Sequence, residues 1–268
     1  MASLKLSHYR IRQFVLGLVG LLLVSVGVIV GLRNPPHLYS SGILISVGCS
    51  IIAAVVVSSM SPLNEEAYEN FMSLGISSVY PSRRDVEARK WVQWLRSAKH
   101  KCVMVGIAHG NWCRDPDFEG ALTERLHNNV DVKIFFLKPD GPAAGLRTKE
   151  DKGRDTVNQI KTSIGVVWNI RKTLAPELAT RLKLFVYEAT PSMGMTWIDE
   201  FMIATHYLAG SENVTSPALL LEPSRFGSEH EGLYGIYAKN VQSIEKEFSE
   251  PITEANIGDY TLPGACDN

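Results

Sequence analysis

The sequence lacks the short motifs that mark the common nucleotide-binding, hydrolase and zinc sites. It contains no Gly-rich phosphate loop of the Walker kind, no Gly-x-Gly-x-x-Gly stretch and no Gly-x-Ser-x-Gly elbow. His109 and Cys113 are four residues apart, but the intervening Gly-Asn-Trp and the following Asp-Pro disfavour a helix that would bring both onto one metal. The sequence therefore predicts no metal site and no bound cofactor.

Cysteine is scarce, and its spacing suggests no covalent framework. The four cysteines, Cys49, Cys102, Cys113 and Cys266, form no Cys-x-x-Cys pair and no pattern typical of a disulfide-rich domain. This usage is typical of a protein whose main domain faces the reducing cytoplasm.

Acidic residues are absent from the first sixty positions, which hold only four basic residues, Lys5, Arg10, Arg12 and Arg33. The rest of the chain carries 23 basic against 28 acidic residues, a net charge of -5. A domain of this charge does not attract a nucleic-acid backbone by bulk electrostatics, so we expect no bulk nucleic-acid binding.

Two long apolar runs occupy the N-terminal region. Residues 14–32 and 42–60 each contain 19 positions without a charge or a proline, about the minimum for a membrane-spanning helix. A signal peptide and a buried core helix are the alternatives, but the residues after the first run do not resemble a cleavage site. We therefore predict a two-helix transmembrane hairpin over residues 1–60 and a lipid bilayer as partner.

The distribution of basic residues predicts how this hairpin is oriented. Lys5, Arg10 and Arg12 precede the first run, whereas only Arg33 lies in the connecting loop. By the positive-inside rule both termini are then cytoplasmic, as in a multi-pass protein of the bacterial inner membrane.

Small residues recur at every fourth position of the second run, and Gly27-x-x-x-Gly31 lies in the first. This spacing lets helix backbones approach closely. Two readings stay open: the two spans pack on each other, or they form the face of a homo-oligomer. The stripe in the second run comprises Gly42, Ser46, Ser50, Ala54 and Ser58.

The remainder of the chain alternates between strand and helix patterns, which predicts an α/β fold with a mixed or parallel sheet and flanking helices. We expect a linker over residues 61–82, the α/β domain over 83–250 and a loosely held tail over 251–268. The predicted strands are 101–108, 130–137, 182–187, 195–203, 205–208 and 218–221. The predicted helices are 82–98, 118–127, 149–174 and 233–248.

One stretch resembles a known family. Trp197-Ile198-Asp199 is followed by Gly210-Ser211-Glu212-Asn213 and by Glu222, and this order is similar to the phospholipase D superfamily. The family motif is His-x-Lys, four residues and Asp, then a strand ending in Gly-Ser-x-Asn. The resemblance covers about residues 75–250 and implies a phospholipase D-like sheet with flanking helices.

The sequence departs from that motif at its reactive positions. Counting back from Asp199, Ser192 stands where the family has its nucleophilic His, and Gly194 stands where it has the phosphate-holding Lys. The gap from Asp199 to Gly210 is also four residues longer than usual. A serine without a paired base is a poor nucleophile. The sequence therefore leans against enzymatic activity.

What remains of the motif could bind an anion without cleaving it. Ser211, Asn213, Asp199 and His206 are the candidate ligand-binding residues, and His109 could add charge if protonated. If the domain is active instead, the candidate catalytic residues are His109, His206 and Asp199. The pair Arg83 and Arg84 reads as a solvated helix start, with a phosphate or headgroup contact as the alternative.

Three functions follow from these observations. The first is a membrane-anchored, non-catalytic sensor of a phosphorylated ligand, a lipid headgroup or a protein partner. Its architecture is similar to that of bacterial antiviral-defence effectors that act on the membrane. The second is a divergent phosphodiesterase or nuclease, which requires His109 and His206 to meet at one phosphate. The third is a membrane scaffold protein whose groove is empty.

Overall fold

The computed structural model of the chain describes residues 15–16, 18–26, 28–30, 43–52, 71, 73–150, 155–207, 215–224 and 232–263. The chain divides into two compact units, Met1–Asn70 and Phe71–Asn268. The first unit holds the apolar runs, and the second holds the sheet and every candidate site residue.

In the first unit, residues 18–26 and 43–52 are helical. Their apolar side chains face outward, and Leu21 and Leu22 are 61% and 57% exposed. No helix among the described residues is long and apolar enough to cross a membrane. The predicted spans 14–32 and 42–60 extend beyond those residues at both ends.

Two glycines mark where the two helical segments of this unit touch. A Cβ atom built on Gly48 would lie 2.7 Å from the carbonyl oxygen of Gly20, so the backbones meet where neither residue has a side chain. Ser46 and Ser50, two members of the predicted small-residue stripe, are exposed instead. The other three members, Gly42, Ala54 and Ser58, lie outside the described residues.

The second unit is built on an eight-stranded sheet with the order β1-β7-β6-β5-β2-β3-β4-β8. Strands β2, β3 and β4 are parallel, and all other neighbours are antiparallel. This confirms the predicted α/β class with a mixed sheet. The strands are β1 (Ile76–Tyr80), β2 (Lys101–Gly106), β3 (Asp131–Leu137), β4 (Leu182–Tyr187), β5 (Met193–Ile198), β6 (Phe201–His206), β7 (Ala218–Leu221) and β8 (Ser249–Pro251).

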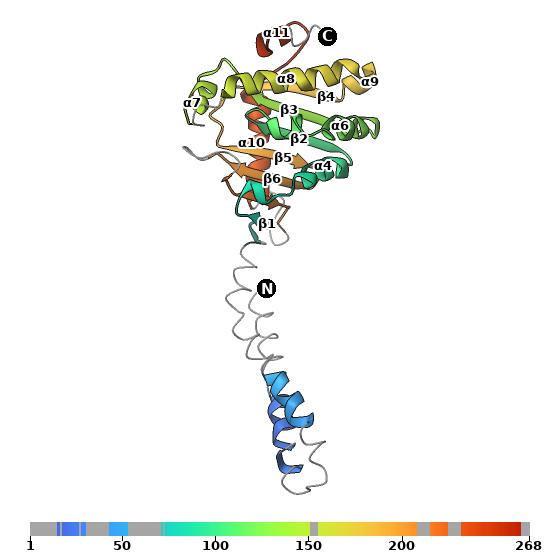
Figure 1. The fold of residues 1–268 in the computed structure, drawn as a ribbon, viewed down its shortest axis with the longest axis vertical. Coiled ribbons are helices and arrows are strands. Elements are labelled where there is room, and N and C mark those ends of the chain that lie inside the picture. The colour runs from blue at the N-terminus through green and yellow to red at the C-terminus, as the bar shows by residue number, and fades with distance from the viewer. Residues whose placement is uncertain are drawn as a thin grey trace. The chain divides into compact units, whose positions relative to one another are not determined.

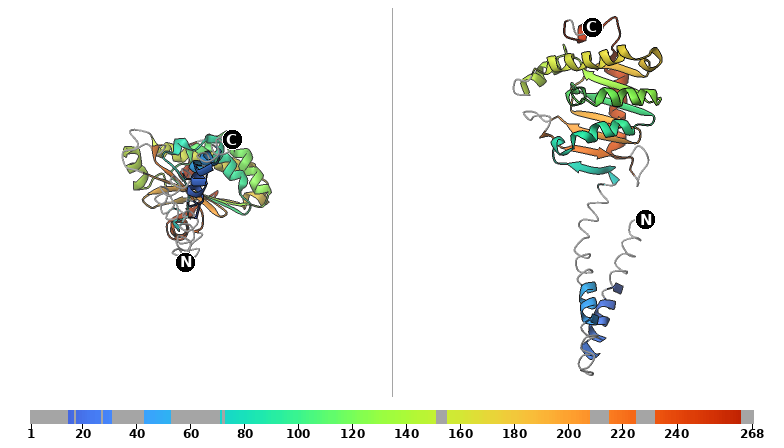
Figure 2. Two further views of the ribbon diagram at one scale, coloured as in Figure 1. Left: turned by 90° about the horizontal axis from the view of Figure 1, so that it is seen from below. Right: turned by 45° about the vertical axis from the view of Figure 1, so that its right-hand side comes forward.

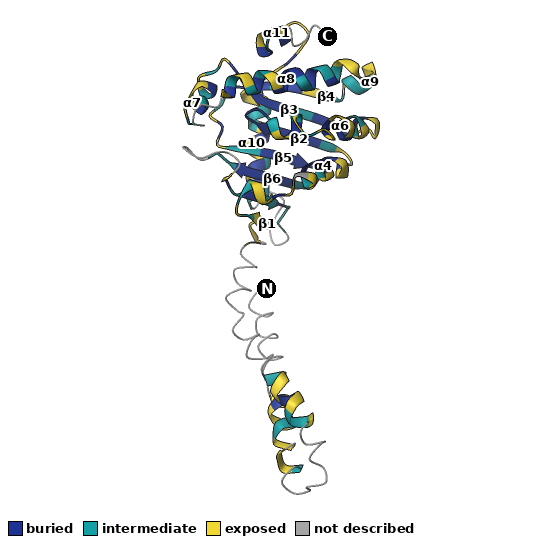
Figure 3. Cartoon of the chain, in the orientation of Figure 1, coloured by how far each residue is buried: buried dark blue, intermediate teal, exposed yellow. Residues whose placement is uncertain are grey.

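Helices cover both faces of this sheet. In Figures 1 and 2, α4, α6 and α8 lie on one face and α10 on the other. The central strands are therefore buried on both sides, as their dark blue ribbons in Figure 3 show, and they read as continuous apolar runs. The helices are η2 (Arg83–Asp85), α4 (Ala88–Ser97), α5 (Gly110–Cys113), α6 (Phe118–His127), α7 (Pro142–Glu150), α8 (Thr156–Thr173), α9 (Pro176–Ala179), α10 (Leu233–Glu247) and α11 (Ile257–Tyr260).

The predicted linker and tail both contribute to the folded unit. Strand β1 lies inside the predicted linker 61–82, yet it pairs with β7 at the sheet edge. The tail was expected to be loose, but β8 pairs with β4, and Ile252, Ile257 and Tyr260 are buried. A few apolar side chains hold this short polar segment to the sheet. Because they form no long helix or strand, no periodic pattern in the sequence predicts the packing.

Two predicted elements are each split in the structure. The helix expected over 149–174 is divided into α7, which begins earlier at Pro142, and α8, which begins after its N-cap Asp155. The predicted helix from Ser82 begins as the short helix η2, where Ser82 and Asp85 form a capping box. Extended backbone at Val86 then ends η2, and α4 begins at Ala88.

The strand predicted over 195–203 is in fact a tight hairpin. Strands β5 and β6 pair antiparallel, with Ile198 opposite Phe201, and the chain turns at Asp199 and Glu200. Asp199 has a φ of 46°, a left-handed conformation that Asp tolerates better than most residues. Because the residues on both sides of the turn are apolar, the sequence predicted one continuous strand instead of two.

The Asp199 carboxylate ties this hairpin to the start of β2. It accepts hydrogen bonds from the backbone N–H groups of Lys99, His100 and Lys101 at 2.6, 3.0 and 2.9 Å. Burial acts to raise the pKa of this carboxyl, but the three donors outweigh it and hold the pKa below its ordinary value. Asp199 therefore stabilises the fold where β5 meets β2.

Replacing Asp199 with Asn should destabilise the second unit. The amide keeps the turn but offers one oxygen to three donors, so we expect a loss of about 1–3 kcal/mol in the free energy of unfolding. Because the folded pKa is depressed, the carboxylate contributes stability above the unfolded pKa and loses it as the pH falls through the folded pKa. Thermal unfolding of D199N should therefore depend less on acid pH than that of the wild type.

The neighbouring Glu200→Gln variant is the matched control, because Glu200 is exposed in the same turn. Equal unfolding temperatures for D199N and E200Q would contradict this structural role of Asp199.

Candidate functional site

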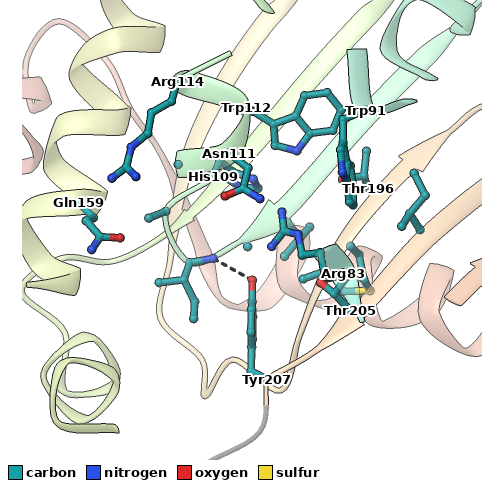
Figure 4. Close-up of a pocket in the computed structure, with 18 of the residues that line it drawn as sticks. Arg83, Trp91, His109, Asn111, Trp112, Arg114, Gln159, Thr196, Thr205 and Tyr207 are labelled. Carbon is teal, nitrogen blue, oxygen red and sulfur yellow. Dashed lines mark hydrogen bonds between the residues drawn. The ribbon is translucent and has the colours of Figure 1, made fainter. Parts of the chain in front are cut away.

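A cavity of about 110 Å³ opens at the carboxyl end of β2. Because β5 runs antiparallel to β2, the start of β5 and the end of β6 reach the same place. The first turn of α8 and the short helix η2 complete the wall, as Figure 4 shows. We call this hollow the Arg83 cavity. Its polar lining residues are Arg83, His109, Asn111, Arg114, Thr156, Gln159, Thr196, Thr205 and Tyr207.

Arg83 places a guanidinium group inside this cavity. Its backbone N–H donates to the carbonyl of Ser216 at 2.8 Å, and its Cζ lies 5.0 Å from the ring centroid of Trp91. Its Nε is buried and has no hydrogen-bond partner. Burial lowers the pKa of this guanidinium, which the nearby Tyr207 partly offsets. A half-buried cation thus lies over a ring face, and no acidic side chain among the described residues pairs with it.

The surroundings of Arg83 favour a negatively charged occupant. None of the lining residues that the structure describes is acidic. Arg114, which follows α5, also lines the cavity, and Figure 4 shows its guanidinium directed toward Gln159. The first turn of the 18-residue helix α8 adds the positive end of its dipole, although Asp155 already caps the Asn158 N–H.

His109 lines the same cavity but does not add charge to it. Its Nε2 lies 3.0 Å from the carbonyl oxygen of Phe135 and donates to it, which leaves Nδ1 without the proton. Burial lowers the pKa of His109 to about 4; the bond to Phe135 opposes this shift and the charge of Arg83 adds to it. The expectation that His109 adds positive charge therefore fails at neutral pH, and its ring offers an acceptor instead.

Tyr207 fills the space beside Gly194. A Cβ atom at Gly194 would lie only 2.6 Å from the Tyr207 hydroxyl oxygen, and one at Gly106 would lie 3.2 Å from it. The hydroxyl accepts a hydrogen bond from the Ile107 N–H at 3.3 Å, the dashed line in Figure 4. The space that a side chain at position 194 would need is therefore occupied by the phenol of Tyr207, which follows β6.

The structure does not bring the three candidate catalytic residues together. His109 lines the cavity, whereas Asp199 lies past the opposite end of β5. His206 follows Thr205 on the other face of the sheet, where its Nε2 lies 3.3 Å from the hydroxyl of Tyr237 on α10. Ser192 is exposed and lines a different hollow, beside α10.

The remaining predicted ligand-binding residues, Ser211 and Asn213, lie outside the described residues. Within the part of the chain that the structure covers, no cluster of three His, Cys, Asp or Glu side chains could hold a metal ion. The sequence assigned Arg83 to a solvated helix start and did not single out Arg114 or Tyr207. Their convergence depends on strand order, because Arg83 and Tyr207 are more than a hundred positions apart in the chain.

Comparisons with known proteins place the fold only loosely. No family model and no curated protein sequence matches the chain. Among solved structures, the archaeal chromatin protein TrmBL2, which shows a novel mode of DNA binding, is 13% identical, with a TM-score of 0.40, over 78% of this chain and 69% of its own. The phospholipase D family member Nuc from Salmonella typhimurium is 16% identical, with a TM-score of 0.36, over 66% of this chain and 99% of its own.

The phosphatidylserine synthase of Haemophilus influenzae Rd KW20 is a third neighbour. It is 10% identical, with a TM-score of 0.41, over 60% of this chain and 36% of its own. The neighbours thus include a phospholipase D family member, as the resemblance implied. All three of these TM-scores are below 0.5.

The proton on His109 gives a pH-dependent prediction. The unfolded side chain titrates near 6.5 and the folded one at about 4, so protons favour the unfolded chain between these values. We expect stability to decrease as the pH falls from about 6.5 through 4, and to decrease less in His109→Asn, whose side chain tolerates the left-handed backbone. NMR titration of the His109 ring should show a neutral imidazole at pH 6. A midpoint above 6 would contradict the buried, uncharged His109.

Proposed function

We propose that residues 71–268 form a non-catalytic domain that binds a phosphorylated ligand in the Arg83 cavity. The observation that carries this proposal is the Arg83 side chain, which is half-buried against Trp91, has a fully buried Nε without a hydrogen-bond partner, and meets no carboxylate among the described residues. Taking a charge out of water costs several kcal/mol unless an opposite charge compensates it. A phosphate group in the cavity would supply that compensation, and Arg83 matches its geometry with paired N–H donors.

The cavity offers the mixture of groups that a phosphate ester needs. Arg83 and Arg114 provide charged donors, Asn111 and Gln159 provide neutral ones, and His109 provides one acceptor for a ligand hydroxyl. A carboxylate shares the charge, but the tetrahedral oxygens of a phosphate use donors from several walls at once. Sulfate has the same shape, but unlike a monoprotonated phosphate it has no proton to donate to the His109 acceptor. The ligand class we infer is therefore a phosphate monoester or free phosphate.

We further propose that residues 14–60 anchor this domain at the cytoplasmic face of a bacterial inner membrane. The two uncharged runs and the basic residues before them support this placement. The outward-facing leucines and valines of the first unit support it as well. In this proposal the chain senses its ligand at the membrane, and a rearrangement of small-residue helices within a homo-oligomer would serve a role such as antiviral defence.

A divergent phosphodiesterase is the second candidate function, suggested by the resemblance to the phospholipase D superfamily. It requires a nucleophile and an acid at one phosphate. The placement of His206 on the α10 face and of Tyr207 at the lysine position favours binding over this chemistry.

The Arg83→Met variant tests the binding function. Loss of the guanidinium should weaken the binding of inorganic phosphate by about 2–5 kcal/mol, which raises the dissociation constant roughly thirtyfold or more. The same change removes an uncompensated buried charge, so the unliganded protein should keep or gain thermal stability. Binding is measured by isothermal titration calorimetry and stability by thermal unfolding, both on the full-length chain in mild detergent.

Arg84→Met is the matched control, because the adjacent Arg84 is exposed on the same short helix. Phosphate should stabilise R84M and the wild type against heat equally, by mass action. If R83M binds phosphate as tightly as R84M does, the Arg83 cavity is not the binding site.

The alternative is tested by hydrolysis of bis(4-nitrophenyl) phosphate. We expect no turnover by the full-length chain, because no paired nucleophile and base lie at the cavity among the described residues. Turnover that is lost in His109→Asn and retained in His206→Ala would instead make the chain a phosphodiesterase with a single histidine.

A further inference from the structure

One side chain that lines the Arg83 cavity, Tyr207, lies near two arginines, Arg83 and Arg147. Tyr207 lies between the cavity and α7, where the Cζ of Arg147 is 5.4 Å from the Tyr207 ring centroid. The positive charges of Arg83 and Arg147 both act on the Tyr207 hydroxyl. Arg147 is buried and pairs with Glu150 through its Nη1 at 2.5 Å, and it does not line the cavity.

The hydroxyl of Tyr207 is fixed by its neighbours on three sides. It fits into the space left by Gly106 and Gly194, and it accepts the Ile107 N–H. Since its oxygen is the acceptor in that bond, its own proton remains to donate. The ring therefore acts as a wall, while the hydroxyl proton can serve an anion held by Arg83.

We propose that Tyr207 is the specificity-determining residue of this cavity and limits it to one phosphoryl group. Its ring separates Arg147 from a ligand in the cavity, so a second phosphoryl group cannot bind that arginine. This inference rests on the proposed phosphate binding. The preferred ligand is then a terminal phosphate, free or on an ester such as a lipid headgroup, and a diphosphate gains no extra affinity from its second group.

The test compares phosphate with pyrophosphate in the full-length chain and in three variants. Tyr207→Ala and Tyr207→Leu remove the wall, whereas Tyr207→Phe keeps the ring and loses only the hydroxyl. Calorimetry gives the ratio of the two dissociation constants for each protein. In the wild type we expect the ratio to stay close to one.

In Tyr207→Ala and Tyr207→Leu, the affinity for pyrophosphate should rise about tenfold relative to that for phosphate, because the second phosphoryl group reaches Arg147. Adding Arg147→Met to either variant should return the ratio to its wild-type value. In Tyr207→Phe the affinity for both anions should fall several-fold, while the ratio of the two dissociation constants stays unchanged. Using two wall-removing variants keeps the test decisive if one of them does not fold.

Gly194→Ala provides an independent test of how Tyr207 packs against the cavity wall. In the wild type the added Cβ would press on the Tyr207 hydroxyl and weaken phosphate binding several-fold. In the Tyr207→Ala background the same change should have no effect. A non-zero coupling between positions 194 and 207 therefore supports the proposal, and additive effects overturn it.

The outcomes separate this inference from the binding function itself. If the wild type binds neither anion, the proposed phosphate site fails, and the role of Tyr207 fails with it. If phosphate binds and depends on Arg83, but removing the wall leaves the ratio unchanged, only the role of Tyr207 is overturned. Dihexanoyl phosphatidic acid, titrated beside inorganic phosphate, distinguishes a lipid headgroup from a free anion, and tighter binding of either one is consistent with a single-phosphoryl pocket.

Discussion

The antiparallel pairing of β5 with β2 decides where the polar groups of the second unit meet. Strands β2, β3 and β4 form a parallel half, and β5, β6, β7 and β1 form an antiparallel half. Because the two halves join at this one pair, the end of β2 lies beside the start of β5 and the end of β6. The carboxylate of Asp199 secures the other end of the pair by binding three backbone amides ahead of β2. Any shift of this register would move Gly194 and Tyr207, which the β5–β6 hairpin holds together, away from Gly106 on β2 and open the cavity wall.

Within that frame the cavity is electrostatically unbalanced. Natural folds usually place a buried arginine against a carboxylate, because an isolated buried charge opposes folding. Here Arg83 has an aromatic face, a neutral histidine and a tyrosine hydroxyl around it. The unfavourable charge is confined to one place, where a ligand can reach it. This arrangement is expected of a binding site that gives up some stability for affinity.

Most of the α/β layer could be predicted from the sequence, because its central strands are continuous apolar runs with helices between them. The hairpin at Asp199 was missed, since the residues on both sides of the turn are equally apolar and only two residues, Asp199 and Glu200, separate them. The packed tail was missed for the opposite reason, because its few buried side chains have no periodicity. The cavity could not be predicted, since sequence spacing carries no information on side chains brought together by strand order. For Arg83 the sequence favoured a solvated helix start, and a phosphate contact was only the alternative interpretation.

The resemblance to the phospholipase D superfamily is informative mainly through what replaces its reactive groups. By the resemblance in sequence, the lysine of that family would fall at Gly194 on β5. Tyr207 takes up the vacated space from the adjoining strand, and its hydroxyl approaches a Gly194 Cβ position to within 2.6 Å. The positive charge in this cavity comes from a different element, the short helix η2 that carries Arg83. A cation on that element can hold a phosphate, but neither candidate nucleophile lies opposite it in the described part of the chain: Ser192 is exposed, and His206 is on the other face of the sheet. A cation in the cavity without a nucleophile beside it is the arrangement that the proposed recognition of a phosphate without cleavage requires.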